Sequence, residues 1–363
     1  MLFARGDFPA AAAAYKATLR ANPGDTGAQL NLAAIRLYQN DLNAAEPILD
    51  SLLSVGPQGE RAAPLLAEVL RRRTEAARGA SVGGAESRVP FLSADPLPVV
   101  RVIADGVAAN FLVDTGAEVV LEPSFAARIG MATSAAGAGV FVGGLRAPVQ
   151  RGRLASLSIG SATAYDLPVQ VLATHATVLD PNLHIEGVVG TTYFERFLVT
   201  IDYPNGELIV RPRTAQDSAA FEARAAAARA AIVPCYLVGD HFVVAKAQVN
   251  GASPGLFVFD SGIEGAGVMA SSRLVGPAEI SLSQARAATG YGGGGAVTEV
   301  PFVARTVRVG NAIQRDVPGT FTPQGSAFDL FPFVIWGAIS NDFLKHYAYT
   351  VDFDAMKLVL APE

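Results

Sequence analysis

Two patterns of hydrophobic and polar positions divide this chain. Up to about residue 73, apolar and small residues recur at the three- to four-residue spacing of one helix face. From about residue 91, short apolar runs such as Val99-Val100-Arg101-Val102-Ile103 are bounded by Gly, Asn, Asp and Pro, which predicts β-strands joined by turns. Within this second region the Ala-rich stretch 214–231 predicts a helix. We therefore expect a short helical segment followed by a mostly β protein.

The β region is internally duplicated. Residues 111–116 (Phe-Leu-Val-Asp-Thr-Gly) and 257–262 (Phe-Val-Phe-Asp-Ser-Gly) are near copies, each an apolar strand ending in Asp-Thr/Ser-Gly. Further matches recur at an offset of 150 and include Gly143/Gly293, Gly160/Gly310, Asp166/Asp316, Gly187/Gly337, Thr200/Thr350 and Asp202/Asp352. The motif aspartates differ by 260 − 114 = 146, so the second copy holds four additional residues, which we place within 263–269. Asp105-Gly106 and Asn250-Gly251 predict hairpin turns ahead of each motif.

The repeated motif predicts that its two acids, Asp114 and Asp260, meet. Two carboxyl groups that share one site cannot both ionise easily, so one keeps a proton while the other acts as a base. The hydroxyls of Thr115 and Ser261 can hydrogen-bond between the two loops. Gly116 and Gly262 would let backbone N–H groups approach the carboxylates.

On these residues, each half resembles a retroviral-type aspartic peptidase unit, and the pair resembles a bilobed, pepsin-like enzyme over residues 91–363. The resemblance implies two pseudo-twofold-related lobes of the double-ψ β-barrel type, at 91–213 and 232–363, with 214–231 as a helical connector. It also implies a water molecule held by Asp114 and Asp260, a polypeptide substrate, no cofactor and no metal. Because both aspartates lie in one chain, a monomeric peptidase unit is expected. The abundance of Ala and the excess of Arg over Lys fit a bacterial source.

The family also has an apolar-apolar-Gly element behind each catalytic loop. In addition, two glycine-rich segments are expected to form hairpins that cover the cleft, with ordinary loops as the alternative. The first element corresponds to Val188, Val189 and Gly190 in the first lobe and to Ala338, Ile339 and Ser340 in the second. The candidate flap residues are Phe141, Gly143 and Gly144 in the first lobe and Tyr291, Gly292 and Gly293 in the second.

The second lobe departs from the family pattern. Ser340 replaces a glycine, and Ile263 follows the second motif where the first has the small residue Ala117. These differences and the adjacent insertion predict a distorted loop. They keep open an alternative function, a catalytically weak or inactive peptide-binding module of the same fold.

The helical segment resembles the tetratricopeptide repeat over residues 1–73. Its 34-residue period is carried by Gly6-Asp7-Phe8, Ala11, Tyr15, Leu19 and Pro23, followed by Asn40-Asp41-Leu42, Ala45, Leu49, Leu53 and Pro57. In this register Met1 to Arg5 is the tail of an incomplete helix, so the natural chain is expected to start further upstream, and the half-repeat should expose an apolar face.

Two roles stay open for these repeats, a docking spacer or a surface for a protein partner. Any self-association is expected to arise from the exposed half-repeat, so a chain lacking residues 1–85 should keep its activity. Residues 74–90, rich in Ala, Gly and Ser without periodicity, predict a linker.

Composition and charge exclude several further classes of protein and of partner. No apolar run approaches the ~18 residues of a membrane-spanning helix, and a net charge of −5 argues against a nucleic-acid partner. The basic run 71–73 is expected to close a helix. Cys235, the one cysteine, lies in an apolar run and predicts a core residue rather than a nucleophile. It leaves the compartment open, with a periplasmic or secreted location preferred to a cytoplasmic one.

Motifs typical of other enzyme classes also occur in the chain, but without the secondary structure that those classes require. Gly251-Ala252-Ser253-Pro254-Gly255 fits a serine-hydrolase elbow but leads into a strand, and 290–295 fits a dinucleotide loop without a preceding strand. A glycosidase pair of carboxylates would not need duplicated Asp-Thr/Ser-Gly turns. The four histidines, His175, His184, His241 and His346, show no helical spacing for zinc.

Overall fold

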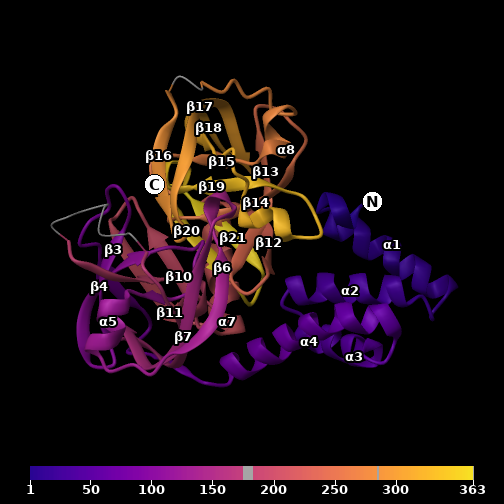
Figure 1. The fold of residues 1–363 in the computed structure, drawn as a ribbon, viewed down its shortest axis with the longest axis horizontal. Coiled ribbons are helices and arrows are strands. Elements are labelled where there is room, and N and C mark those ends of the chain that lie inside the picture. Colours follow the sequence, from indigo (N-terminus) through magenta and orange to yellow (C-terminus); the bar gives the residue numbers. More distant parts are fainter. Residues whose placement is uncertain (175–182, 284–285, 363) are drawn as a thin grey trace.

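The computed structural model describes residues 1–174, 183–283 and 286–362, and places a helical segment beside two β lobes (Figure 1). The helical segment comprises η1 (Phe3–Arg5), α1 (Phe8–Ala21), α2 (Thr26–Tyr38), α3 (Leu42–Leu52) and α4 (Gly56–Ala76). Side chains of Asp25 and Asp41 cap α2 and α3 by accepting hydrogen bonds from the backbone N–H of Ala28 and Ala44. None of the described helices has the length and apolarity needed to cross a membrane.

Lobe one is a closed barrel with a crossed connection at its centre. Its elements are β3 (Val99–Ala104), β4 (Val107–Val113), β5 (Val120–Leu121), α5 (Pro123–Arg128), β6 (Ser134–Val140), η2 (Val142–Gly144), β7 (Arg146–Ile159), β8 (Ala162–Val171), β9 (Ile185–Val189) and α6 (Thr191–Phe194). Strand β9 runs parallel to β4 and antiparallel to β5, and the β7–β8 pairing closes the barrel. This order threads β9 behind the end of β4, where the first motif begins.

Lobe two repeats the same path. Its elements are β13 (Phe242–Val249), β14 (Gly255–Asp260), β15 (Val268–Ala270), α8 (Ser272–Val275), β16 (Ala288–Gly292), β17 (Gly295–Val309), β18 (Ala312–Phe321), η5 (Ala327–Leu330), β19 (Ile335–Ser340) and α9 (Asn341–Leu344). Strand β19 is parallel to β14 and antiparallel to β15. The β17–β13 pairing closes this barrel, so the expected mostly β, two-lobed fold is confirmed.

The strand pairings correct the position of the insertion. Val120 pairs with Val188 and Gln170, and its counterpart Met269 pairs with Ala338 and Thr320. Val120 and Met269 differ by 269 − 120 = 149, whereas the motif aspartates differ by 146, so three additional residues precede Met269. The fourth additional residue lies between Ala270 and Thr320, because Thr320 is the counterpart of Gln170 and 320 − 170 = 150. Placing all four within 263–269 was therefore wrong by one residue.

A six-stranded antiparallel sheet joins the lobes. It contains β2 (Ser87–Pro90), β10 (Phe197–Asp202), β11 (Glu207–Pro212), β12 (Ala231–Val238), β20 (Ala348–Asp352) and β21 (Lys357–Ala361). At its centre Thr200 lies opposite Thr350, with the two hydroxyl oxygens 2.7 Å apart. Helix α7 (Ala215–Ala227) forms the covalent connection between the lobes.

The segment 74–90 differs from the expected linker. Helix α4 continues to Ala76, β1 (Ala80–Val82) pairs with β8, and β2 pairs with β11 in the central sheet. The segment is thus hydrogen-bonded to both sheets. Backbone pairing, which needs no apolar periodicity, holds it there.

Lobe two covers the apolar face of the half-repeat. Phe3 and Phe8 are buried against Phe333, and the backbone N–H of Val334 donates to the carbonyl of Ala4 at 2.9 Å. Helical residues and strands β12, β13, β14 and β19 share one hydrophobic cluster. The expectation of an exposed half-repeat was therefore wrong, because the second lobe supplies the missing neighbour.

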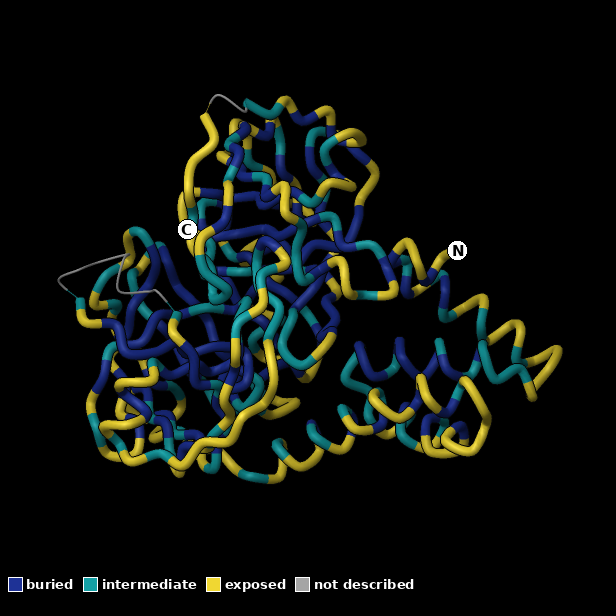
Figure 2. The backbone as a smooth tube through the Cα atoms, viewed as in Figure 1, coloured by how far each residue is buried: buried dark blue, intermediate teal, exposed yellow. Residues whose placement is uncertain are grey.

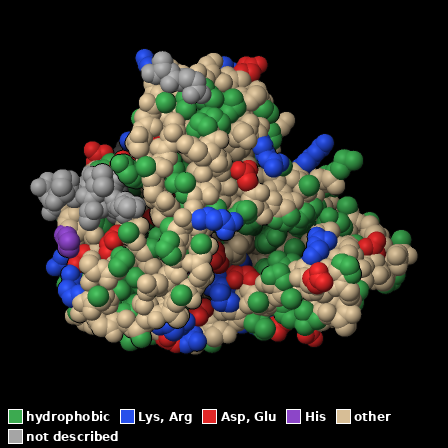
Figure 3. Space-filling view, in the orientation of Figure 1, with side chains coloured by type: hydrophobic (Ala, Val, Ile, Leu, Met, Phe, Trp, Pro, Cys, Tyr) green, Lys and Arg blue, Asp and Glu red, His purple; other side chains and the backbone are tan. Residues whose placement is uncertain are grey.

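The surface agrees with this organisation. Buried chain is concentrated in the sheets of both lobes, whereas the outer turns of the helical segment are exposed (Figure 2). On the face drawn in Figure 3, hydrophobic side chains gather where the helices meet lobe two, and acidic and basic side chains are interspersed.

Candidate active site

The two motif aspartates occupy equivalent positions at the ends of β4 and β14. Each carboxylate accepts a hydrogen bond from the glycine two residues later: Gly116 N–H to Asp114 Oδ1 at 2.7 Å, and Gly262 N–H to Asp260 Oδ1 at 2.9 Å. Behind them, β9 and β19 fix the strands, since Asp114 N–H donates to the carbonyl of Val189 at 3.0 Å. The fold therefore places the two aspartates in equivalent turns, which are related by the pseudo-twofold axis.

The two carboxyl groups lie against each other across the pseudo-twofold axis. Each is close enough to the other to shift its pKa. A Cβ atom on Gly116 would lie 2.3 Å from the carboxyl carbon of Asp260, and one on Gly262 would lie 2.3 Å from that of Asp114. Only glycine leaves room for each carboxyl beside the opposite loop.

The neighbouring hydroxyls tie the two loops together. Ser261 Oγ accepts from the backbone N–H of Thr115 and donates to the carbonyl of Val113. Thr115 Oγ1 accepts from the N–H of Ser261 and donates to the carbonyl of Phe259, at 3.0 and 2.9 Å. Both side chains are almost fully buried. This reciprocal set fixes the relative position of the carboxyls.

Burial is the main influence on the pKa values of Asp114 and Asp260. Both side chains keep a partly accessible edge, yet the atoms packed around them raise the pKa of Asp114 and raise that of Asp260 well above its usual range. The negative charge of Asp114 raises the pKa of Asp260 further, whereas the Gly116 N–H and the adjacent Asp260 carboxyl act in the opposite direction on Asp114. The two carboxyl groups therefore titrate as one unit, and a single proton shared between them is the favoured state near neutral pH.

Thr115→Val is expected to lower the free energy of unfolding by about 2–4 kcal/mol, because it leaves the buried N–H of Ser261 and carbonyl of Phe259 without partners. Urea unfolding at pH 7 measures this. Thr133→Val removes an exposed hydroxyl that donates to Gln150 and should change stability by less than ~0.5 kcal/mol. Equal losses of stability in the two variants would contradict a stabilising role for the Thr115 hydrogen bonds between the loops.

The loop that follows Asp260 has room for the Ser340 side chain. A Cβ on its counterpart Gly190 would lie 2.1 Å from the carbonyl oxygen of Ala117. In lobe two the loop after Asp260 takes a different path, and Ser340 Oγ donates to the carbonyl of Ala266 at 2.7 Å. The inserted residues reshape the loop around this side chain, so the expected distortion does not displace the Gly262 N–H from Asp260. Val188 and Ala338 lie in equivalent parallel pairings with Leu112 and Val258, and Val189 and Ile339 in those with Val113 and Phe259.

The two candidate flaps meet. The β6–β7 hairpin carries Phe141, Gly143 and Gly144, and the β16–β17 hairpin carries Tyr291, Gly292 and Gly293. A Cβ on Gly293 would lie 2.6 Å from the Phe141 ring, and one on Gly292 would lie 3.5 Å from Val142. Gly143 N–H donates to the carbonyl of Gly325 in lobe two at 3.1 Å. Tyr291 is exposed at the rim.

The rejected nucleophiles lie apart from the pair. Ser253 is exposed in the turn before β14. Cys235 is fully buried in β12, and burial raises the pKa of its thiol far above the usual range, which keeps it protonated. The 290–295 glycines form the β16–β17 hairpin. His175 lies outside the described residues.

A charged cluster beside the pair was not foreseen from the sequence. Glu118 follows β4, Arg151 lies in β7, and Asp240 and His241 share the turn between β12 and β13, so three separate segments meet across the lobe boundary. Helical spacing could not reveal this cluster, because its members approach only when the lobes pack. The position of Glu118, four residues after Asp114, was the one available signal.

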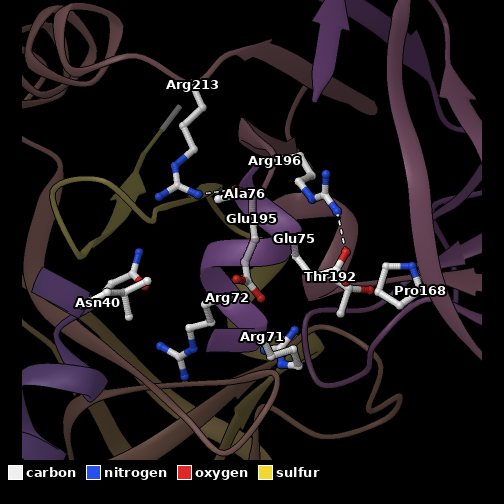
Figure 4. Close-up of a pocket in the computed structure, with 11 residues that line it drawn as sticks. Asn40, Arg71, Arg72, Glu75, Ala76, Pro168, Thr192, Glu195, Arg196 and Arg213 are labelled. Atoms are coloured by element: carbon white, nitrogen blue, oxygen red, sulfur yellow. Dashed lines mark hydrogen bonds and ion pairs between the residues drawn. The ribbon is translucent and has the colours of Figure 1, made fainter. Parts of the chain in front are cut away.

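A separate small pocket lies between the helical segment and lobe one (Figure 4). Arg71, Arg72 and Glu75 of α4 face Glu195 and Arg196, and Arg196 pairs with Glu75 at 2.8 Å. Burial raises the pKa of the Glu195 carboxyl. Neither motif aspartate lines this pocket, so it is not a candidate for the same chemistry.

Comparisons with known proteins agree with both parts of the fold. An aspartyl protease family model matches residues 100–193, and a tetratricopeptide repeat model matches residues 2–69. No curated protein matches the chain. Among solved structures, a retropepsin-like aspartic protease from Rickettsia conorii is similar at 22% identity and a TM-score of 0.28, covering 37% of this chain and 94% of that one. Soybean Basic 7S globulin is similar at 10% identity and a TM-score of 0.39, covering 77% and 95%.

Proposed function

We propose that this chain is an aspartic-type endopeptidase whose catalytic residues are Asp114 and Asp260. One observation carries the proposal: two carboxyl groups lie side by side in equivalent Asp-Thr/Ser-Gly turns at the junction of two lobes, and reciprocal hydrogen bonds join the turns. The match of residues 100–193 to the aspartyl protease family supports it. The activity itself is what the experiments below test.

In the proposed mechanism the two acids have different roles. We assign the ionised role to Asp114, whose pKa is raised less. It accepts a proton from a water molecule bound between the carboxyls as that water attacks the scissile carbonyl carbon. Asp260 donates its proton to the carbonyl oxygen, which gives a tetrahedral diol intermediate. Asp114 then gives its proton to the leaving nitrogen while Asp260 takes a hydroxyl proton from the diol. Cleavage of the C–N bond releases two peptides, restores the starting protonation of the pair and needs no covalent enzyme intermediate.

The substrate class follows from the surroundings of the pair. The two hairpins that meet near Phe141 and Gly293 offer strand edges on which an extended polypeptide can form backbone hydrogen bonds. Cross-lobe contacts such as Gly143 to Gly325 would have to open before a chain enters. We propose an unfolded or extended peptide as substrate, bound between lobes of a single chain.

The alternative, a peptide-binding module without turnover, is less favoured by the geometry. It depended on Ser340, Ile263 and the adjacent insertion misaligning the second loop. The distances from Gly116 to Asp114 and from Gly262 to Asp260, 2.7 and 2.9 Å, are closely matched in spite of both residues. Equivalent donors at both carboxylates support the catalytic reading.

The first test is cleavage of a peptide library across pH 3–9. Activity should rise as Asp114 ionises and fall as Asp260 loses its proton, which gives a bell-shaped profile. Because both pKa values are raised, the acidic limb should lie above the ordinary aspartate value of about 3.9. Ser253→Ala is the control and should keep full activity. A rate that climbs steadily into alkaline pH would exclude the dyad.

A further inference from the structure

The charged cluster beside the dyad crosses from one lobe to the other. In lobe two, His241 Nδ1 and Asp240 Oδ1 are 2.7 Å apart; in lobe one, Arg151 lies 3.3 Å from Glu118 and 3.8 Å from the other oxygen of Asp240. Glu118 is 5% exposed and accepts a hydrogen bond from the Gln170 amide. One ligand atom each of Glu118, Asp240 and His241 lies within 4.8 Å of the other two.

This arrangement has the features of an ion-pair network. A histidine and two carboxylates could also hold a metal ion. Here, however, Arg151 already brings a positive charge to both acids, and His241 Nδ1 faces Asp240 directly. The cluster thus contains its own cations, one from each lobe.

We propose that His241 is a positioning residue of the active site. As an imidazolium between Asp240 and Glu118, it holds the loop that carries Asp114 against lobe two and places a positive charge next to the dyad. The inference rests on the proposed peptidase function for its catalytic consequences. Its structural and electrostatic parts can be measured without turnover.

The groups that face His241 favour its charged form. Burial alone would lower its pKa, but the charge and hydrogen bond of Asp240, followed by the charges of Glu118 and Asp114, raise it to about 9. Arg151 on β7 faces the same acids. In return, the positive charge of His241 lowers the pKa of both Asp114 and Asp260, against the effect of their burial. His241 therefore stays charged over the range in which the dyad works.

The helical segment supports His241 from behind. Buried Arg72 of α4 donates to the carbonyls of Leu237 and Gly239 at 3.2 and 3.1 Å, and Arg71 donates to the carbonyl of Asp240 at 3.2 Å. These bonds hold the turn between β12 and β13, where His241 lies. Figure 4 shows both arginines on the same helix. Support for the active site thus extends through this turn to the tetratricopeptide-like part of the chain.

His241→Gln tests the proposal, since glutamine keeps hydrogen-bonding capacity and removes the charge. Without that charge both dyad pKa values should rise, so the whole pH–rate profile should move up by roughly half to one pH unit. On the acidic limb of the wild-type profile kcat should fall about three- to tenfold with KM within about twofold. The two profiles should converge above about pH 9, where the wild-type imidazole also loses its proton. His346→Gln, at an exposed histidine, should leave the profile unchanged.

A second measurement separates this inference from the proposed function. Carbon-13 NMR titration of labelled aspartate carboxyls, assigned with Asp114→Asn and Asp260→Asn, should show higher apparent pKa values in His241→Gln even if no cleavable peptide is found. Absence of any cleavage would count against the peptidase alone. Unchanged carboxyl titrations in His241→Gln, or titrations that shift when EDTA is added to the wild type, would overturn the role of His241.

Discussion

Asp114→Asn and Asp260→Asn are each expected to lower kcat about 10²–10⁴-fold, the usual contribution of general acid–base catalysis. An amide at position 114 cannot accept the proton of the attacking water. An amide at position 260 cannot donate one to the carbonyl oxygen. Peptide cleavage under single-turnover conditions, with circular dichroism to check folding, measures the effect. Asp316→Asn is a matched control, because Asp316 is exposed and its φ of 54° suits asparagine.

The same variants should reveal that the pair costs stability at neutral pH. A carboxyl whose folded pKa is raised stabilises the fold below its unfolded pKa and loses that contribution as pH rises through the folded value. Asp260→Asn removes the ionisation, so its Tm at pH 7 should exceed that of wild type by about 1–3 °C, and the advantage should vanish near pH 3. Undiminished cleavage by both Asn variants, or a lower Tm for Asp260→Asn at pH 7, would contradict the proposed dyad.

Deleting the helical segment is expected to unfold or aggregate the remainder, not to release a minimal peptidase. Tyr236, Val244, Leu256 and Phe333 are buried beneath the helices in a shared cluster, and deletion would expose them to water. Deletion of residues 1–85 would also remove β1, which pairs with lobe one. Expression of residues 86–363, followed by light scattering and a cleavage assay, tests this. A soluble, fully active product would show that the helices are dispensable.

Phe8→Ala tests the same interface without shortening the chain. The Phe8 ring is fully buried, with its centroid 4.9 Å from that of Tyr236 and 5.0 Å from that of Phe333. Its loss should lower the free energy of unfolding by about 3–5 kcal/mol. Leu53→Ala, in an exposed position of the same segment, should cost less than ~1 kcal/mol. Urea unfolding followed by tryptophan fluorescence, from Trp336 in lobe two, reports whether lobe two shares the loss.

The duplication made the two-lobed fold predictable from sequence. The strand ends carrying Asp114 and Asp260, and the series of matches at an offset of 150 that follows them, contain enough local information to pair equivalent elements. Docking of the helices was not predictable, because the apolar face around Phe8 gives no indication of which surface will cover it. The contacts of Ser340 depended on the path of an inserted loop, and the Glu118 to His241 contact depended on packing between lobes. Contacts between residues that are distant in sequence cannot be predicted from the local spacing of residue types.

The contact between Thr200 and Thr350 has a consequence for ancestry. These residues occupy the same position in the two copies, and they face each other in antiparallel strands, so each half presents the same edge to the other. Such an isologous contact is what two identical subunits form around a twofold axis. The arrangement is therefore compatible with a homodimer that preceded gene fusion, with helix α7 added to an interface that already closed. The two copies now differ, since the second is longer by four residues and has Ser340 where the first has Gly190.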